Sequence, residues 1–435
     1  MTALQGHPDR ASLTALQIAS LRSLLGALIP NNRFYTPRLS AAGLDASIPD
    51  LETFRARMPF TRKQDLVADQ SAHPPYGTNL TYPLERYTRF HQTSGTTGTP
   101  LRWLDTPESW DALVDTWVEV YRASGVTPGD CIFFAFSFGP FLGFWTAFDA
   151  GQRLGCLCIP GGGMSSTARL RTILDNHVSV LCCTPTYALR LGEVAAEEGI
   201  SLASNPVRRI LVAGEPGASI PATRARIEAL WPGATLYDHH GMTETGPVSI
   251  PCPARPDVLH VLESRFLPEV IVPATGCPVP AGESGELVLT TLHRTASPLL
   301  RYRTGDLVRP CYSAPCACGR YDLALEGGIL GRVDNMVIVR GVNLHPTAVE
   351  SVVRQFPEVA EFRVELYRER SMQEIKLHIE PVPECRDPEG LVSQVEKALR
   401  AAFNLRFPVE LVPPGTLPRF ELKARRWIYR ESEDA

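Results

Sequence analysis

Hydrophobic residues recur along the chain in short runs that polar and glycine-rich segments separate. Near the two ends these residues follow helical spacing, over 13–28 and over 392–403. Between them, short runs rich in β-branched residues alternate with helical stretches. We expect strands at 178–183, 210–213, 286–292 and 336–339. Strands that alternate with helices predict an α/β fold built of layered sheets.

The longest apolar run covers residues 131–148. Its length is just enough to span a membrane, but Gly139, Pro140 and Gly143 interrupt it. The pattern favours a core strand, a turn and the start of a helix. The first ten residues have neither a basic start nor an apolar continuation, so no secretory signal is predicted. We therefore expect a cytoplasmic protein that makes no membrane contact.

The length of 435 residues suits about two or three domains. With 44% hydrophobic and 21% charged residues, the chain is neither disordered nor collagen-like. A formal net charge of −4 gives no electrostatic footprint for nucleic acid. The pattern changes after Gly331, where a small α+β unit with a strand at 375–382 begins. We expect a boundary within 331–334, which divides the chain into domains 1–332 and 333–435.

The sharpest local signal is the segment HQTSGTTGTP at 91–100. Its small side chains allow backbone N–H groups to turn inward around an anion, and its hydroxyls add donors. The residues concerned are Thr93, Ser94, Gly95, Thr96, Thr97 and Gly98. No Lys follows the last Gly, so the segment is not a Walker loop. A phosphate loop and a solvated Ser/Thr/Gly turn both fit these residues when they are taken alone.

Two further segments carry carboxylates that suit a nucleotide. In YDHHGMTETGP at 237–247, Glu244 is a hard oxygen ligand for Mg²⁺ and Thr243 is a donor for an α-phosphate. In RYRTGDL at 301–307, a glycine turn after a strand would let Asp306 accept hydrogen bonds from vicinal ribose hydroxyls. A capped helix start or a loop is the alternative for the first segment, and an Asx turn is the alternative for the second.

These segments, in this order and spacing, resemble the motifs of the adenylate-forming superfamily of acyl-CoA synthetases, adenylation domains and luciferases. TSGTTGTP resembles the phosphate loop, YDHHGMTET the adenine and magnesium motif, and YRTGDLV the ribose motif. GRVDNMVIVRGVNLHP is similar to the hinge motif, and GTLPRFELKARR to the C-terminal lysine motif. LCCTPTYAL and RGVNLHP are similar to the phenylacetate–CoA ligase branch. The resemblance implies a large multi-sheet α/β adenylation domain and a small, mobile α+β C-terminal lid domain.

Carried over by position, the resemblance implies a role for each motif residue. The phosphate loop would hold the β- and γ-phosphates of ATP. By the same resemblance, Thr243 would contact the α-phosphate, Glu244 would bind Mg²⁺, Asp238 would lie beside the adenine and Glu215 would bind the nucleotide. Asp306 and Arg332 would bind the ribose, and Asp334 would be the hinge.

The resemblance makes Lys423 the catalytic lysine of the small domain. Of the 43 basic residues, only Lys63, Lys376, Lys397 and Lys423 are lysines. Lys423 is the only lysine in the last 35 residues and closely follows a Gly/Pro-rich loop, which independently favours this role. The alternative is an ordinary solvated charge.

The implied chemistry has two steps. A carboxylate attacks ATP while Mg²⁺ and Lys423 screen the phosphate charge, and acyl-AMP and pyrophosphate form. The small domain then rotates about Asp334, and the thiol of CoA displaces AMP. None of the eleven Cys residues is needed as a nucleophile. A carrier-protein phosphopantetheine is the alternative acceptor, and a non-catalytic acyl-nucleotide-binding homologue or a zinc hydrolase are alternatives of other classes.

The resemblance places an acid pocket at three segments of the chain. The residues are Phe136, Phe138 and Phe141 of an aromatic run, Ala213 and Gly214 of an AGEP segment, and His239, His240 and Gly241 before the magnesium motif. The phenylalanines would form a flat slot for a ring, although plain core is the alternative for each of them. The two histidines suit a polar ring substituent, so anthranilate and hydroxylated benzoates stand beside phenylacetate as candidate acids.

A cysteine cluster suits a structural metal. The C-x-C-G turn with Cys316 and Cys318 points two thiolates at one centre, and Zn²⁺ takes four N or S ligands. The resemblance supplies Cys252 and His260 as the other pair of ligands, with Cys311 as a spare candidate. Free thiols are the alternative. The branch is commonly dimeric, so the resemblance adds a homodimer to the expected partners, which are the aromatic acid, ATP and CoA.

Overall fold

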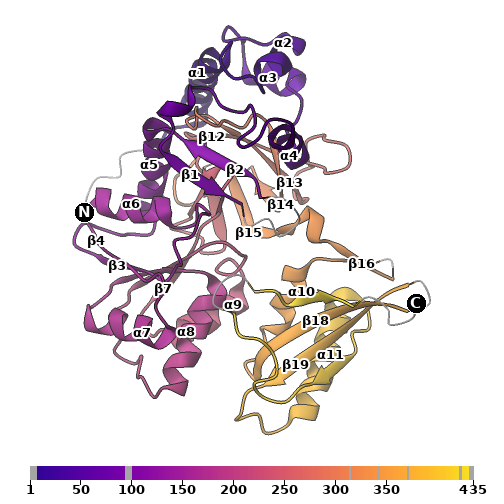
Figure 1. Ribbon diagram of the computed structural model, residues 1–435. Helices are drawn as coiled ribbons and strands as arrows, with labels where there is room; N and C mark the ends of the chain where they lie inside the picture. The colour runs from indigo at the N-terminus through magenta and orange to yellow at the C-terminus, as the bar shows by residue number, and fades with distance from the viewer. Residues whose placement is uncertain are drawn as a thin grey trace.

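The computed structural model describes residues 7–93, 100–312, 315–340, 342–369, 372–420 and 424–430, and the structural statements below concern these residues. Figure 1 shows a large body formed by the chain up to strand β15 and a smaller body, coloured orange to yellow, formed by the chain from strand β16 onward. Two sheets with helices make up the large body. The smaller body combines an antiparallel strand pair, two helices and further strands, so the expected α/β and α+β architecture is confirmed.

The first sheet of the large body is parallel and has the strand order β4-β3-β5-β6-β7. Its strands are β3 (Cys131–Phe134), β4 (Leu157–Pro160), β5 (Val180–Cys183), β6 (Arg209–Val212) and β7 (Thr235–Asp238). Every residue of β5 is buried, as a strand covered on both faces requires. One face packs against α5 (Pro107–Ala123) and α6 (Trp145–Leu154), and the other against α7 (Ser166–Asp175), α8 (Pro185–Glu197) and α9 (Pro221–Leu230). The strands expected at 178–183 and 210–213 are confirmed.

The apolar run at 131–148 forms a strand, a turn and the start of a helix, as expected. Strand β3 ends at Phe134 and helix α6 begins at Trp145. Between them Phe138 and Gly143 adopt positive φ angles of 51° and 41°, which reverse the chain. The run is hydrophobic because it passes through the core between the sheet and its helices.

The second sheet of the large body is antiparallel, with the strand order β10-β11-β15-β14-β13-β12. Its strands are β10 (Ser249–Pro251), β11 (Val258–Val261), β12 (Phe266–Ile271), β13 (Gly285–Thr291), β14 (Tyr302–Cys311) and β15 (Ala324–Arg332). Two short hairpins lie beside it, β1 (Arg89–Gln92) with β2 (Arg102–Asp105) and β8 (Gly241–Met242) with β9 (Gly246–Pro247). All of β13 is buried, which confirms the strand expected at 286–292.

Asp306 lies within strand β14, whereas the sequence predicts a turn that follows a strand. The pairing of β14 shifts register against β13 and again against β15, between Leu307 and Val308. Gly305, at a φ angle of 77°, lies at this irregularity. A bulge inside a long strand changes the direction of a side chain, as a turn would. The expected break in regular structure at Gly305 is therefore present, but it is a bulge within β14 and not a turn after a strand.

Four N-terminal helices pack on the second sheet: α1 (Arg10–Leu28), α2 (Thr36–Ala41), α3 (Leu51–Arg57) and α4 (Lys63–Ala72). Leu21 and Phe54 share one core cluster with Leu267 and Tyr302 of the sheet. Helix α1 is 19 residues long and reaches a mean hydropathy of 1.3 over an 18-residue window, so it is long and apolar enough to cross a membrane by those two criteria alone. A core helix of a soluble protein passes the same test, so this is weak evidence for a membrane span.

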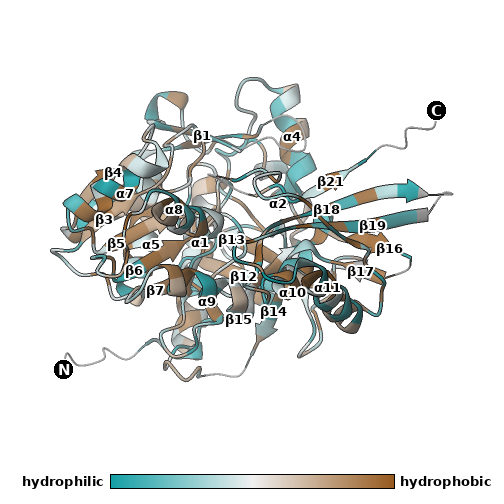
Figure 2. Cartoon of the chain, turned by 90° about the horizontal axis from the view of Figure 1, so that it is seen from below, coloured by the Kyte–Doolittle hydropathy of each residue, from teal (hydrophilic) through white to brown (hydrophobic). Residues whose placement is uncertain are grey.

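The smaller body is built around a four-stranded sheet with the order β20-β19-β18-β21. Its elements are β16 (Val337–Val339), β17 (Val342–Leu344), α10 (Pro346–Val353), β18 (Val359–Glu369), β19 (Met372–Pro381), α11 (Pro388–Phe403), β20 (Val409–Leu411) and β21 (Trp427–Tyr429). Buried Phe362, Val364 and Leu366 alternate with polar residues along β18, and Figure 2 shows this alternation of colours. The strands expected at 336–339 and 375–382 and the helix expected at 392–403 are confirmed. The exact boundary within 331–334 stays a prediction.

A buried ion pair joins strand β2 to the turn between β8 and β9. The guanidinium of Arg294 donates to both carboxylate oxygens of Asp105, at 2.7 and 2.6 Å. It also donates to the backbone carbonyls of Thr243 and Glu244, at 2.8 and 2.9 Å. The two charged side chains are only 1% and 0% exposed. These hydrogen bonds are therefore shielded from water, and removing one of the two charged groups would leave the other buried and unpaired, which lowers stability strongly.

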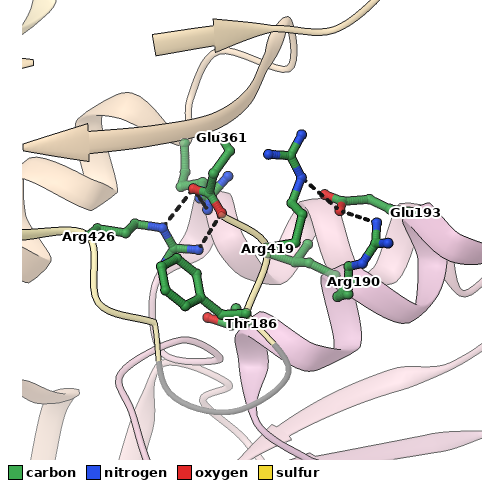
Figure 3. Close-up of a pocket in the computed structure, with 9 residues that line it drawn as sticks. Thr186, Arg190, Glu193, Glu361, Arg419 and Arg426 are labelled. Atoms are coloured by element: carbon green, nitrogen blue, oxygen red, sulfur yellow. Dashed lines mark hydrogen bonds and ion pairs between the residues drawn. The ribbon is translucent and has the colours of Figure 1, made fainter. Parts of the chain in front are cut away.

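A second ionic cluster lies in the smaller body where it faces α8. The guanidinium of Arg426 bonds both oxygens of Glu361, at 2.8 and 3.1 Å, and Arg354 bonds the same carboxylate at 3.2 Å. Figure 3 shows Arg426 beside Glu361, with Arg419 reaching toward Glu193 of α8. Burial alone would raise the pKa of Glu361, but the two guanidinium groups outweigh it and hold this pKa at about 2.

Replacing Asp105 with Ala should destabilise the large body strongly. The substitution leaves the Arg294 charge buried without a carboxylate, which typically costs about 3–5 kcal/mol. The matched control is Asp111→Ala, because the pair between Arg153 and Asp111 is solvent-exposed and worth about 0–1 kcal/mol. Urea unfolding measures both variants. Equal losses of stability in the two variants would contradict the importance of the buried pair.

Lowering the pH should weaken the Glu361 cluster. Because the folded-state pKa of about 2 lies below the ordinary value of 4.5, the stabilisation is complete above the ordinary value and is lost as the pH falls toward the folded one. A shift of this size corresponds to about 3 kcal/mol. The stability gap between wild type and Glu361→Gln should therefore narrow between about pH 5 and pH 3 in urea unfolding. A stability difference between the two proteins that does not change with pH would contradict the lowered pKa of Glu361.

Candidate functional site

Among the described residues, the segment that follows Asp238 of the parallel sheet meets Asp306 of the antiparallel sheet, which Arg332 also contacts. Asp238 ends strand β7 of the parallel sheet, and Ser219 donates to its carboxylate from the backbone N–H at 3.0 Å and from the hydroxyl at 2.5 Å. Burial raises the pKa of Asp238 above its ordinary value, although both hydrogen bonds oppose this. A buried acceptor at the carboxyl end of a parallel strand lies where α/β sheets bind nucleotides.

Thr243 and Glu244 lie in the turn between β8 and β9, which follows β7 and Asp238 along the chain. The buried guanidinium of Arg294 holds the carbonyl groups of both residues, so the backbone of this turn is fixed. The Glu244 side chain is 9% exposed, and the ammonium of Lys63 lies 3.5 Å from its Oε1 atom. A rigid turn that presents a carboxylate oxygen fits a ligand of a hard cation such as Mg²⁺.

Asp306 is held between two cationic or polar partners. His240 Nε2 lies 3.0 Å from Asp306 Oδ2, and Arg332 donates to Oδ1 at 3.1 Å. Burial alone would raise the pKa of Asp306, but the bonds and charges of His240 and Arg332 hold it below its ordinary value. Arg332 also bonds the exposed Asp334 at 3.0 Å, so the last residue of β15 is tied to the predicted hinge. The structure thus brings Asp306, Arg332 and Asp334 together.

The predicted acid-pocket residues separate into two groups. Phe136 contacts Phe138 and Phe141 edge to face, with ring centroids 5.3 and 5.1 Å apart, and Ala213 packs against the same core. His239 lies near Trp117, at 4.3 Å between ring centroids. His240, in contrast, contacts the carboxylate of Asp306 and not this aromatic cluster.

His239 is a fixed, neutral imidazole. Its Nδ1 atom lies 2.7 Å from the carbonyl oxygen of Ser249, so Nδ1 carries the proton and Nε2 is left as an acceptor. Burial lowers the pKa of His239 to about 3, so the ring stays uncharged at neutral pH. Gly241 allows the backbone to pass close by, because a Cβ atom there would lie 2.9 Å from the Gly246 carbonyl.

The phosphate loop and the predicted catalytic lysine lie largely outside the described residues. Thr93 is described: its N–H donates to the Leu101 carbonyl at 2.9 Å, and its hydroxyl accepts from the Leu101 N–H at 3.0 Å. Both ends of the loop are therefore held together. Ser94, Gly95, Thr96, Thr97 and Gly98 lie outside the described residues, and so does Lys423.

Glu215 links the two bodies. Its Oε1 atom accepts from the Thr186 N–H at 2.9 Å, and its Oε2 atom accepts from the Ala424 N–H at 3.0 Å. Gly214, at a φ angle of 97°, precedes it in the AGEP segment. The contact fixes the residue that follows Lys423 against the large body. Sequence reasoning missed it, because Glu215 and Ala424 are 209 residues apart and nothing local marks the pair.

The cysteine cluster has the dimensions of a tetrahedral metal site. Cys252 Sγ and Cys316 Sγ lie 3.7 Å apart, and Cys318 Sγ lies 3.4 Å from His260 Nε2. Zn–S bonds of about 2.3 Å at the tetrahedral angle place two sulfurs about 3.7 Å apart, so the spacing fits zinc. His260 Nδ1 contacts the Asp322 carbonyl at 3.3 Å, which leaves Nε2 as the ligand atom.

All four ligand atoms of this cluster lie within 4.8 Å of one another. The group that could hold a metal consists of Cys252, His260, Cys316 and Cys318, and Cys311 is not among them. Two ligands are buried and two are half-buried. A closed set of this kind is typical of a structural metal site.

Two family profiles match the chain. Residues 90–293 match the AMP-binding enzymes, and residues 341–430 match the AMP-binding enzyme C-terminal domain. The chain is 34% identical to the phenylacetate-coenzyme A ligase of Thermus thermophilus, over 95% of each chain. It is 32% identical to the phenylacetate-coenzyme A ligase of Pseudomonas putida, over 97% of this chain and 96% of the relative.

Solved structures of 2-hydroxyisobutyryl-CoA ligase are similar in fold, at 29% identity over 98% of this chain and 91% of theirs. The TM-score is 0.92 for that ligase in the postadenylation state, in complex with R3-HIB-AMP. It is 0.73 for the same ligase with 2-HIB-AMP and CoA in the thioesterification state. The two bodies of this chain are therefore arranged more like those of the postadenylation state.

These similarities in sequence and fold extend over both bodies and nearly the whole chain. The buried carboxylates and the fixed turn between β8 and β9 are consistent with a nucleotide site of this family. The expected membership of the adenylate-forming superfamily is confirmed. The chain belongs to the AMP-binding, adenylate-forming enzymes, in the branch of the phenylacetate–CoA ligases, and is an AMP-forming acid–thiol ligase.

Proposed function

We propose that the chain is an aryl-acid–CoA ligase. It activates an aromatic carboxylate with Mg-ATP to acyl-AMP and pyrophosphate, and then transfers the acyl group to the thiol of CoA. The observation that carries the proposal is the identity of 31–34% to phenylacetate-coenzyme A ligases over about 95% of the chain. ATP and CoA as co-substrates follow from the family.

In this proposal the chain's own residues bind and orient the nucleotide. Asp306 still has free lone pairs beside its bonds to His240 and Arg332, so it can accept from both ribose hydroxyls. Asp238 lies beside the adenine, and Thr243 donates to the α-phosphate. Bound Mg²⁺, held by Glu244, would neutralise phosphate charge.

Lys423 supplies positive charge to the α-phosphate as the acid carboxylate attacks it. The bond between Glu215 and Ala424 supports this assignment, since it anchors the residue next to Lys423 beside the AGEP segment. Rotation of domain 333–435 about Asp334 would then withdraw the lysine and admit the CoA thiol. We propose that the division at 332/333, the hinge and the cytoplasmic location hold as the sequence predicts.

The acid pocket of the proposal lies at the aromatic cluster. Edge-to-face phenylalanines favour a flat ring, and the Nε2 acceptor of His239 suits a substituent that carries a hydrogen, such as an amino or hydroxyl group. A second candidate is a small hydroxy acid, which the TM-score of 0.92 with 2-hydroxyisobutyryl-CoA ligase favours. A carrier protein stays the alternative acceptor, and a homodimer the proposed assembly.

An end-point assay tests the proposed function. Purified protein is incubated with Mg-ATP, CoA and one acid at a time: phenylacetate, benzoate, anthranilate, salicylate, a hydroxybenzoate or 2-hydroxyisobutyrate. Mass spectrometry should detect AMP and a single dominant acyl-CoA from an aromatic acid. A product from 2-hydroxyisobutyrate alone would favour the second candidate, and acyl-AMP without thioester would indicate a carrier protein. No product from any acid would overturn the proposal.

We also propose that Cys252, His260, Cys316 and Cys318 hold a structural zinc ion. Elemental analysis should find about one zinc per chain, because a closed site of four such ligands binds zinc tightly. Cys318→Ser should lower the zinc content and the stability. The control is Cys277→Ser at an exposed, free cysteine, which should change neither. Well under one zinc per chain in wild type would refute the site and leave free thiols.

A further inference from the structure

Lys63 is a charged residue at the site to which no role has been assigned. It is the first residue of α4, and its ammonium nitrogen lies 3.5 Å from Oε1 of Glu244. The Glu244 side chain is 9% exposed, whereas that of Lys63 is 38% exposed. The Lys63 side chain is therefore the more solvent-accessible partner of the proposed magnesium ligand.

The backbone next to Lys63 is firmly anchored to strand β14. Thr61 is fully buried; its N–H donates to the Arg301 carbonyl and its own carbonyl accepts from the Arg303 N–H, both at 3.0 Å. The Thr61 hydroxyl also donates to the Leu300 carbonyl at 2.7 Å. Lys63 thus extends from a segment paired with the strand that carries Asp306. Its position relative to the site is fixed by the fold, and only its flexible stem is free to adjust.

The sequence of the phosphate loop supplies no positive charge for the phosphates of ATP. The segment Thr93–Pro100 contains neither Lys nor Arg, so the phosphate loop offers only backbone N–H groups and hydroxyls. The other three lysines, Lys376, Lys397 and Lys423, all lie beyond residue 332. Lys63 is therefore the only lysine in the sequence of the large body.

We propose that Lys63 binds the β- and γ-phosphates of ATP and the pyrophosphate that leaves. Mg²⁺ at Glu244 would repel the ammonium from that carboxylate, and the phosphate oxygens are the nearest anionic partners that the reaction brings. As an acid oxygen bonds to the α-phosphorus, the bond from that phosphorus to the bridging oxygen breaks, and its electron pair goes to pyrophosphate. Lys63 keeps its proton and stabilises the charge that develops there.

This role differs from the one proposed for Lys423. Lys63 belongs to the large body, so it stays beside the phosphates while the smaller body rotates. Acyl-AMP carries a single phosphate, so Lys63 should matter for adenylation and for its reversal by pyrophosphate but not for transfer to CoA. The inference rests on the proposed use of Mg-ATP, but it does not depend on which acid is activated.

Calorimetric titration with ATP and with AMP tests the inference without any acid. Lys63→Gln should weaken the binding of Mg-ATP roughly ten-fold or more, as the loss of a charge-assisted contact does, and leave AMP within about two-fold. Lys63→Arg should restore part of the loss. The matched control is Lys397→Gln, at an exposed position on α11, which should change neither affinity.

A second measurement separates phosphate binding from support of Glu244. In ATP–pyrophosphate exchange, Lys63→Gln should raise the KM for pyrophosphate, while thioester formation from supplied phenylacetyl-AMP stays at the wild-type rate. The Mg²⁺ concentration for half-maximal exchange should not move. Equal losses of ATP and AMP affinity, or full recovery of ATP affinity at high Mg²⁺, would overturn the inference. Wild-type protein that binds ATP but activates no acid would refute the aryl-acid proposal alone, since the binding comparison would still decide the role of Lys63.

Discussion

The structure of the site depends on one buried guanidinium. Arg294 gives two bonds to the carboxylate of Asp105 and further bonds to the carbonyls of Thr243 and Glu244, all without access to water. Because a guanidinium is planar and rigid, these partners must keep a fixed geometry. The turn that carries the proposed phosphate and magnesium contacts is therefore positioned by the hairpin β1–β2, which also bounds the phosphate loop. Loss of this charge pair would disturb stability and site geometry together.

The sequence predicts elements and motifs well where the signal is local. The run at 131–148 is recognisable because two glycines and a proline break its apolar pattern, and Asp306 because a glycine precedes it. Prediction from the sequence fails for contacts between segments that are far apart along the chain. Glu215 contacts Ala424 and Lys63 contacts Glu244 only through the tertiary fold, and no local pattern indicates which distant residue each of them meets. The bulge around Asp306 is likewise a property of three paired strands and not of one segment.

Electrostatics divides four buried acidic groups of the protein into two kinds. Asp306 and Glu361 are buried beside guanidinium groups that outweigh desolvation, so their pKa values are held down and they stay charged. Asp238 and Glu215 are buried with hydrogen bonds from uncharged donors, and burial raises their pKa values. A carboxylate of the first kind is a constant negative acceptor. One of the second kind depends on each of its donors, and for Glu215 one donor belongs to the smaller body.

That dependence bears on the proposed rotation of the smaller body. Within it, the Arg426–Glu361 pair is bidentate and almost completely buried. Between the bodies, the contacts are thinner: Arg419 lies 3.8 Å from Glu193, and Arg226 donates a single bond to the Val359 carbonyl. A partly exposed ion pair is worth about 0–1 kcal/mol and a single hydrogen bond from a charged donor about 1.5–3 kcal/mol, whereas breaking a buried ion pair costs about 3–5 kcal/mol. Stronger bonds inside each body than between them are what the proposed rotation would require for both bodies to stay intact.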